Sequence, residues 1–449
     1  MLSDSRRSAT LDPVGSDASR DGAVRLLPRP SLGLVTRVDR VLTWKRARTY
    51  ALVLVGLLVV AWVDVLALGS APLNASGAPM SGDFVAFHSA GRMVSSGRAP
   101  ELYDHAAMSE IQQALVEGRI PNLYDAYRNP PFFAALFAPL APLDLLPAFA
   151  VYSVLSLACL ALALWRLVQE AAWLRSRWWG LVVLVLAFPP VYFGLIDGEN
   201  ATISLLLYVL IYRSLAHGQD RAAGAWAALG LFKPQLFFVF PIVFAAASRW
   251  RALRTYVIVG VVIGGISLAM VGPDGLSAWL RILVEPETGN ARANAWRMAS
   301  LKSFFDLLLP DQTLLALTLY AGCACGLVLT VARAWFRRRS ESLPTLWAMT
   351  CLVAALVDPH LVDYDLTILV AAIPAVAVAR QLRWWLVVLY LLSLFRVLVP
   401  IGESSLQLVV PVLALGAFVA LRGLSHAAGV AYSGEASALE LSTSTAPAS

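Results

Sequence analysis

The sequence predicts an all-α polytopic membrane protein, and three observations lead to this class. Of the 449 residues, 59% are hydrophobic and 14% are charged, with a mean hydropathy of +0.69, whereas a soluble domain carries about 25% charged residues. Apolar runs of about 20 residues, enough for an α-helix to cross a bilayer, recur along most of the chain. These runs are continuous, while the strands of a membrane β-barrel would alternate apolar and polar residues.

Basic clusters predict the orientation of the chain. Arg40, Lys45 and Arg48 surround the start of the first apolar run, and basic residues stay on the cytoplasmic side of membrane proteins. If the N-terminus is cytoplasmic, the later basic clusters also lie on the cytoplasmic side of the membrane. We therefore expect about nine full crossings, with the N- and C-termini in the cytoplasm. The net charge of +6 comes mostly from these clusters, which orient the chain in the membrane. It does not indicate a nucleic-acid partner.

The expected crossings, together with shorter membrane elements, fill most of the middle of the chain. They are 50–69, 147–166, 179–196, 201–213, 255–271, 313–332, 344–357, 363–379, 384–400 and 405–421. Residues 222–247 are interrupted by "KPQ" at 233–235, where the proline breaks the helix. Halves of about 12 residues cannot each cross about 30 Å at 1.5 Å per residue. We expect a broken or re-entrant helical hairpin here, entering and leaving on the cytoplasmic side.

Three regions follow from this layout. Residues 1–40 and 426–449 are rich in small and polar residues and are expected to be disordered cytoplasmic tails. Residues 41–425 form the transmembrane domain, in which 70–130 and 272–300 are the first and second external loops.

Polar side chains that are unusual in such an apolar chain fall on the predicted external side. They are Asp83, His88, Arg92, Asp197, Glu199, Arg292, Arg297, Lys302, Asp358, His360, Asp363 and Asp365. Separate loops thus bring acids, histidines and bases to one face, as expected for a site at a membrane surface.

The stretch "SGDFVAFHSAGR" (81–92) contains Asp83, His88 and Arg92 just outside the first span. Asp83 precedes a helical pattern and fits an N-cap, because a carboxylate accepts backbone hydrogen bonds there. It also fits a general base at the mouth of a lipid-facing cavity. The two roles are compatible only if one carboxylate oxygen remains available. His88 fits either an interfacial aromatic or a ligand-binding residue.

Two apolar segments have a structural and a functional interpretation. Lys233 lies inside a long apolar stretch, where an ammonium is costly unless it is paired or hydrated. Near the inner surface it could instead extend to the headgroups. Residues 127–143, "YRNPPFFAALFAPLAPL", fit an interfacial or re-entrant element beside a lipid tail, or a plain entry into a helix.

Two segments on the predicted external side also have both a structural and a functional interpretation. Arg297 and Lys302 in the second external loop lie beside aromatic residues, which suits a lipid phosphate or a solvated loop. In "DPHLVDYDL" (358–366), the acids could end one helix and start the next. His360 and Asp365 would then lie close to the cavity.

Several common kinds of site are missing from the sequence. It has no Walker A loop, no GxGxxG before a helix, no GxSxG motif and no DxD pair in the first loop. The four cysteines lie in apolar runs without metal-ligand spacing. We interpret them as small core residues, and we expect no metal site and no cofactor.

Five segments, taken in order, resemble glycosyltransferase family 87. They are "GDFVAFHSAGRMVSSGRAPELYD", "NPPFFAALFAPLAPL", "GLFKPQLFFVFP", "AWRMASLKSFF" and "DPHLVDYDLTIL", from about residue 80 to about residue 370. The resemblance implies a C-type glycosyltransferase fold in the cell (inner) membrane, with the active site on the external face. It also implies a polyprenyl-phosphate sugar donor, no nucleotide sugar and no metal, with Asp83 as the catalytic base.

Two positions depart from the family pattern. In "DGENA" (197–201), Glu199 stands where the family usually has glutamine. A carboxylate cannot donate a hydrogen bond unless it is protonated, so the preference for substrate could differ. Asn129 replaces the usual tyrosine before the two prolines, which we expect to be a mild change.

The expected function is inverting transfer of a hexose, with mannose the first candidate, from polyprenyl phosphate to a lipid or glycan acceptor. The residues expected to bind the phosphate or sugar of the donor are His88, Arg92, Glu199, Lys233, Arg297, Lys302, His360 and Asp365. Membrane lipids are the remaining expected partners. A polymerase or ligase of lipid-linked glycans, and a lipid or solute transporter without chemistry, stay open as alternatives.

Overall fold

The computed structural model describes residues 43–283, 298–337, 343–377, 385, 387–394 and 408–420. The two expected tails and residues 284–297 of the predicted second external loop, Arg297 among them, lie outside the described residues. Contacts divide the chain into Met1–Ala47 and Arg48–Ser449, and the second unit contains all of the site residues considered below.

The described residues are almost entirely helical, and their only strand-like pairings are isolated bridges. Four helices are long and apolar enough to cross a membrane: α2 (Trp44–Ala67), α6 (Leu145–Glu170), α14 (Trp250–Ile282) and α16 (Thr313–Phe336). A fifth candidate is the pair α8 (Trp178–Leu186) and α9 (Pro189–Ile196), bent by 65°. Pro189 and Pro190 start a new helix because proline is favoured in a first turn and breaks a helix interior. The predicted all-α class is confirmed.

Shorter helices fill the space between the long ones. They are α10 (Ala201–Ala216), α11 (Asp220–Leu229), α12 (Pro234–Phe237), α13 (Val239–Ala246), α17 (Leu343–Val357) and Val409–Ala420. By length and composition, the described helices account for four or five of the nine expected crossings. The larger number and the C-type fold stay predictions.

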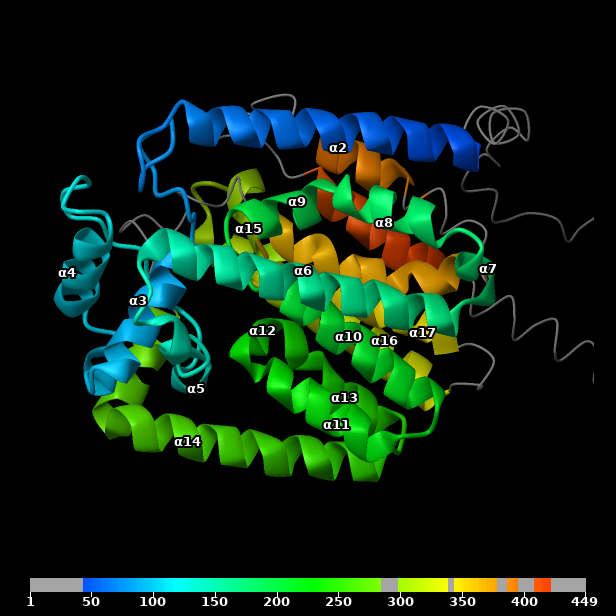
Figure 1. Ribbon diagram of the computed structural model, residues 1–449. Helices are drawn as coiled ribbons and strands as arrows, with labels where there is room; N and C mark the ends of the chain where they lie inside the picture. The colour runs from blue at the N-terminus through cyan, green and yellow to red at the C-terminus, as the bar shows by residue number, and fades with distance from the viewer. Residues whose placement is uncertain are drawn as a thin grey trace, which may run out of the picture. The chain divides into compact units, whose positions relative to one another are not determined.

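Residues 70–130, predicted as the first external loop, contain helices of their own. These are α3 (Phe84–Ser95), η1 (Ala99–Glu101) and α4 (His105–Leu115), and they are followed by α5 (Pro131–Ala134) and η2 (Ala138–Leu140). Figure 1 shows α3, α4 and α5 gathered at one end of α6 and α14, with α7 (Ala172–Arg175) at the other end of α6. Asp83 therefore lies at the end of the long helices where α3 begins.

The start of the predicted second external loop is helical. Gly272 has φ 70° and ψ −179°, which interrupts α14, and Pro273 begins a second helical segment because proline suits the first turn of a helix. Helix then continues to Ile282. Whether residues 272–300 form an external loop stays a prediction.

The interrupted stretch between α11 and α13 forms a hairpin. The turn η3 (Gly230–Phe232) ends the first arm, and α12 and α13 form the second. Asp220 at the start of α11 forms an ion pair with Arg249, just beyond α13. Because the two ends of the hairpin meet, its tip at Lys233 lies away from them. The predicted break at this proline is confirmed.

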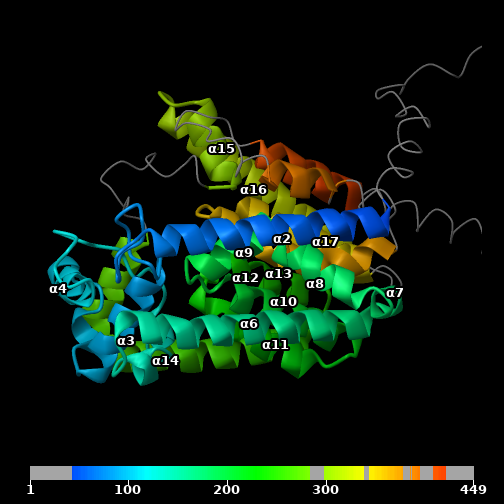
Figure 2. The same ribbon diagram turned by 45° about the horizontal axis from the view of Figure 1, so that its top comes forward.

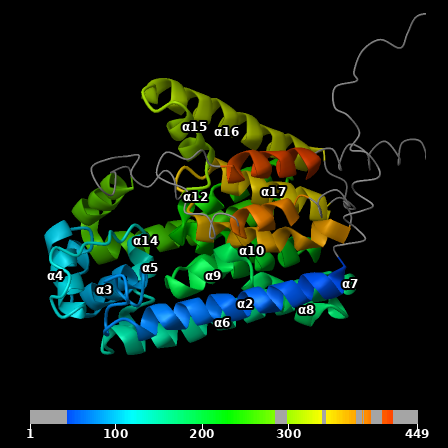
Figure 3. The same ribbon diagram turned by 90° about the horizontal axis from the view of Figure 1, so that it is seen from above.

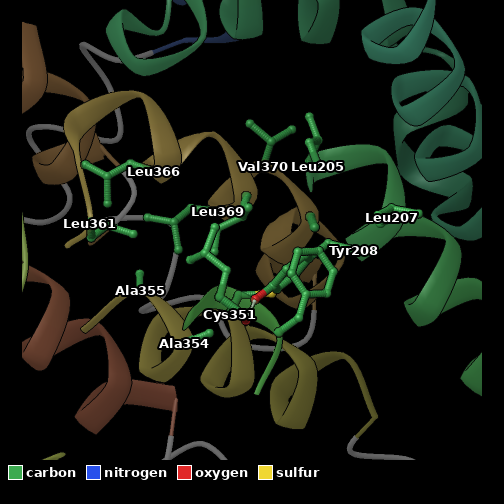
Figure 4. Close-up of a cluster of buried hydrophobic side chains, with 14 of the residues drawn as sticks. Leu205, Leu207, Tyr208, Cys351, Ala354, Ala355, Leu361, Leu366, Leu369 and Val370 are labelled. Carbon is green, nitrogen blue, oxygen red and sulfur yellow. Dashed lines mark hydrogen bonds between the residues drawn. The ribbon is translucent and has the colours of Figure 1, made fainter. Parts of the chain in front are cut away.

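A buried core joins α10, α17 and η6 (Asp363–Ala377). All of residues 345–357 are buried, as expected for a helix that packs on every side. Figure 4 shows Tyr208, Cys351 and Leu369 from these three elements close together. The Tyr208 hydroxyl also donates to the backbone oxygen of Leu236 at 2.7 Å, which attaches α12. This core fixes four elements whose ends reach the site.

Helix α16 lies on the outside of this core. Figure 2 shows α15 (Leu301–Leu308) next to it, and Figure 3 shows it running past α17. Cys323 and Cys325 on α16 are exposed, whereas Cys351 is buried. The expectation that all four cysteines are core residues is therefore wrong for the two on α16.

Candidate active site

The break in the α11–α13 hairpin places Lys233 inside the protein. Its backbone has φ −123° and ψ 74°, outside the helical region, because the residue before a proline is sterically excluded from that region. Pro234 then starts α12. The side chain leaves the tip of the hairpin and is only 7% exposed.

The Lys233 ammonium pairs with acids from distant parts of the chain. Nζ is 2.6 Å from Asp365 Oδ1 and 3.8 Å from Glu199 Oε2. It also lies 5.1 Å from the centre of the Tyr364 ring, within the range of a cation–π contact. Of the two interpretations of this lysine, the geometry favours the buried pair, and the ammonium does not extend to the headgroups.

Asp83 occupies the N-cap position of α3 without capping it. Its backbone is helical (φ −69°, ψ −9°), and its side chain makes no capping hydrogen bond. The carboxylate instead lines a cavity. The start of α3 therefore fixes the backbone of Asp83, and the side chain lines the cavity.

Two glycines let the turn before α3 pack closely against the turn before α10. Gly82 (φ +54°) and Gly198 (φ +68°) both have left-handed backbones, which favour glycine. A Cβ on Gly82 would lie 2.5 Å from Asp197 Cα, and one on Gly198 would lie 2.5 Å from Phe84 Cβ. This close packing brings the residues that follow, Asp83 and Glu199, to the same place.

Glu199 is a buried carboxyl at this junction. It is 4% exposed and shares a hydrogen bond with Asp83. Burial raises the pKa of Glu199 to about 8, Lys233 opposes the shift, and the charges of Asp83 and Asp365 add to it. The shift favours the neutral form of Glu199, which can donate a hydrogen bond as the glutamine of the family pattern would.

The cavity has a volume of about 360 Å³. Among its polar and aromatic lining residues are Asp83, Asp125, Tyr127, Arg128, Asn129, Glu199, Asn200, Phe232, Lys233, Gln235, His360, Tyr364 and Asp365. They come from residues 83–129, the turn before α10, the hairpin tip, and the segment that runs from the end of α17 into the first turn of η6. Four parts of the chain thus build one polar hollow.

Arg128 is a cavity residue that the sequence analysis missed. Its Nη1 donates to the backbone oxygen of Ile282 at 2.7 Å, and Trp279 Nε1 donates to the backbone oxygen of Arg128 at 3.0 Å. The end of α14 thereby holds the arginine at the cavity. Its place beside Asn129 and the double proline was the only signal in the sequence.

His360 reaches the cavity from the turn after α17. Its backbone N–H donates to Asp358 Oδ1 at 2.8 Å, so Asp358 holds the turn in place. Burial raises the pKa of Asp358 to about 8; Asp365 adds to the shift, while the His360 N–H and Lys233 oppose it.

The chain also matches a known protein family. A family model of glycosyltransferase family 87 matches residues 127–362, which is more than half of the chain. The chain belongs to glycosyltransferase family 87. It is a membrane glycosyltransferase, and the matched region contains Arg128, Glu199, Lys233 and His360, while Asp83 lies before it. No curated protein and no solved structure matches the chain.

Three of the residues predicted to bind the donor do not line the cavity of this glycosyltransferase: His88, Arg92 and Lys302. His88 Nε2 and Arg92 Nη2 each lie 3.1 Å from the backbone oxygen of Leu143. His88 also stacks on Phe84, and burial lowers the pKa of His88 to about 4, with Arg92 adding to the shift. Lys302 pairs with Asp306 on α15 at 2.6 Å. These side chains support the packing around the site.

In the parts of the chain that the structure describes, no group of three or more His, Cys, Asp or Glu side chains is arranged to hold a metal ion. The acids of the cavity lie instead around one ammonium. The described cavity therefore offers a carboxylate, cations and hydrogen-bonding groups, which are sufficient for proton transfer and for binding an anion.

Proposed function

We propose that this glycosyltransferase transfers a hexose, with mannose as the first candidate, from a polyprenyl-phosphate donor to a hydroxyl group of a lipid or glycan acceptor. The transfer inverts the anomeric centre and takes place on the external face of the cell membrane. The observation that carries the proposal is the Asp83 carboxylate, which caps no helix and lines a cavity that also contains Arg128 and His360.

Asp83 acts as the general base. Its carboxylate takes the proton of the acceptor hydroxyl while that oxygen bonds to the anomeric carbon of the donor. The bond from this carbon to the phosphate oxygen breaks on the opposite face, and the polyprenyl phosphate leaves with the electron pair. A base positioned in this way contributes roughly 10²–10⁴-fold to the rate.

Arg128 and His360 stabilise the leaving phosphate. A phosphate leaving group needs compensation of charge more than it needs a proton, and a guanidinium binds it through two parallel hydrogen bonds. The contacts of Arg128 with the end of α14 hold it before the donor binds. Lys233 stays paired with Asp365, so Arg128 is the cation that binds the phosphate.

The size of the cavity supports transfer of one sugar at a time. A volume of about 360 Å³ is near the lower end for small-molecule sites, about 300–1,000 Å³. It suits the sugar and phosphate of the donor, and the isoprenoid chain extends over apolar surface such as that around the exposed Leu136. A longer glycan, as a polymerase would use, needs more room.

The test is transfer by the purified protein in lipid vesicles, with radiolabelled polyprenyl-phosphate mannose and a lipid extract of the envelope as acceptor. We expect a labelled glycolipid from the wild type and a loss of roughly 10²–10⁴-fold in kcat for Asp83→Asn. Asp311→Asn is the matched control, because Asp311 is exposed between α15 and α16 and should leave the rate unchanged. Size-exclusion profiles show whether each variant folds.

Full activity of a folded Asp83→Asn protein would remove the base assignment. Movement of label across the vesicle membrane without a new glycosidic bond would show a transporter. Incorporation of label from a nucleotide sugar, and not from the polyprenyl phosphate, would overturn the proposed donor.

A further inference from the structure

The charges of the cavity do not balance if all of its inner carboxyls are ionised. Lys233 Nζ is 2.6 Å from Asp365 and 3.8 Å from Glu199, and Asp83 shares a hydrogen bond with Glu199. Like charges that share a buried site disfavour simultaneous ionisation. The ammonium compensates the carboxylate that it contacts, Asp365, and a proton on one of the other two acids would relieve the remaining repulsion.

The surroundings of Glu199 make it the carboxyl that keeps the proton. The titratable groups that face it from the elements packed around it are Asp83, Tyr152, Lys233, Tyr364 and Asp365. Only one of these is a cation, and it lies closer to another acid. Asp83 is less buried and faces the cavity, where its charge is hydrated more easily.

The proton of Glu199 lies in its hydrogen bond with Asp83. A neutral carboxyl donates one O–H, and an ionised carboxyl only accepts, so a neutral Glu199 donates to Asp83 in the hydrogen bond that the two side chains share. The backbone oxygen of Glu199 accepts from the Tyr152 hydroxyl at 3.1 Å, which fixes the turn that carries the donor.

We propose that Glu199 is a positioning residue that, as a neutral acid, hydrogen-bonds the Asp83 carboxylate and so orients this base toward the acceptor hydroxyl. This inference rests on the proposed role of Asp83 as the base. It gives Glu199 a function that the donor-binding interpretation does not contain, namely control of the orientation and charge of the base.

The proton on Glu199 determines how the turnover depends on pH. Burial, as the largest cause, raises the pKa of Glu199 from 4.5 to about 8, so the donor is present below pH 8. Above pH 8 the proton leaves, and two neighbouring carboxylates repel each other. Asp83 then loses its orientation, and turnover falls with rising pH.

The experiment compares kcat and KM between pH 6 and 10 for the wild type, Glu199→Gln and Glu199→Ala. An amide donates at every pH, so Glu199→Gln should keep wild-type turnover at pH 7 within about threefold and lose the alkaline decline. Glu199→Ala removes the donor, so kcat should fall roughly 10–100-fold at all pH values with little change in KM, as expected when a positioning group is lost. Glu110→Gln on the exposed part of α4 is the matched control and should keep the wild-type profile.

An infrared measurement gives a readout that does not depend on activity. The wild type should show a protonated-carboxyl band that disappears above pH 8, and the difference spectrum against Glu199→Gln should assign it. Asp358 also has a pKa of about 8, so Asp358→Asn is measured in parallel.

An alkaline decline that persists in Glu199→Gln, or that Asp358→Asn alone removes, overturns the inference about Glu199. A fully active Asp83→Asn protein overturns the proposed function instead, so the two failures can be distinguished.

Discussion

The buried pair between Lys233 and Asp365 gives the sharpest prediction about stability. Lys233→Met removes an ammonium 2.6 Å from the Asp365 carboxylate, an attraction of about 6 kcal/mol at an effective dielectric constant of about 20. The remaining carboxylate is buried without its partner, and breaking such a pair costs about 3–5 kcal/mol. We therefore expect a loss of about 4 kcal/mol in the free energy of unfolding, the middle of this range.

The assay is thermal unfolding in detergent, followed by tryptophan fluorescence. At about 2 °C per kcal/mol for a long chain, Lys233→Met should lower the midpoint by about 8 °C. The double variant Lys233→Met with Asp365→Asn should recover most of this loss, because no buried charge is left unpaired. Lys302→Met is the matched control: it breaks the more exposed pair with Asp306, which is worth less than about 1 kcal/mol. A midpoint for Lys233→Met equal to that of the control, or no recovery in the double variant, would refute the reasoning.

Three further predictions concern residues around the cavity. Arg128→Gln should lower kcat/KM for the polyprenyl-phosphate donor by roughly 10²-fold, and unchanged donor kinetics would exclude it from phosphate binding. Gly198→Ala forces a side chain into a left-handed backbone and against Phe84, so we expect a loss of about 1–3 kcal/mol, seen as a lower unfolding midpoint. Burial lowers the pKa of His88 to about 4, so the unfolded state binds the extra proton between pH 6.5 and 4, and stability falls as the pH falls. His88→Gln should reduce this acid dependence, measured as the unfolding midpoint at pH 7 and pH 4.5.

The sequence by itself determined the class of the protein, the main helices and the family. Long apolar runs and few charges are properties of local segments, and a helix that must satisfy its own backbone in lipid follows from them directly. The break at Lys233 could also be predicted, because a proline acts on its own backbone and on the residue before it. The match to residues 127–362 bears out the family that the motifs indicated.

Only the tertiary structure decided which polar side chains meet. Asp365 lies 132 residues after Lys233, and no local rule pairs them. The direction of a side chain on a helix depends on what the helix packs against, so His88 and Arg92 reach Leu143, although they belong to the same stretch as Asp83. Arg128 became a cavity residue because the end of α14 holds it there. Whether Glu199 is charged depends on its burial and on its neighbours from other segments, and these exist only once the chain is folded.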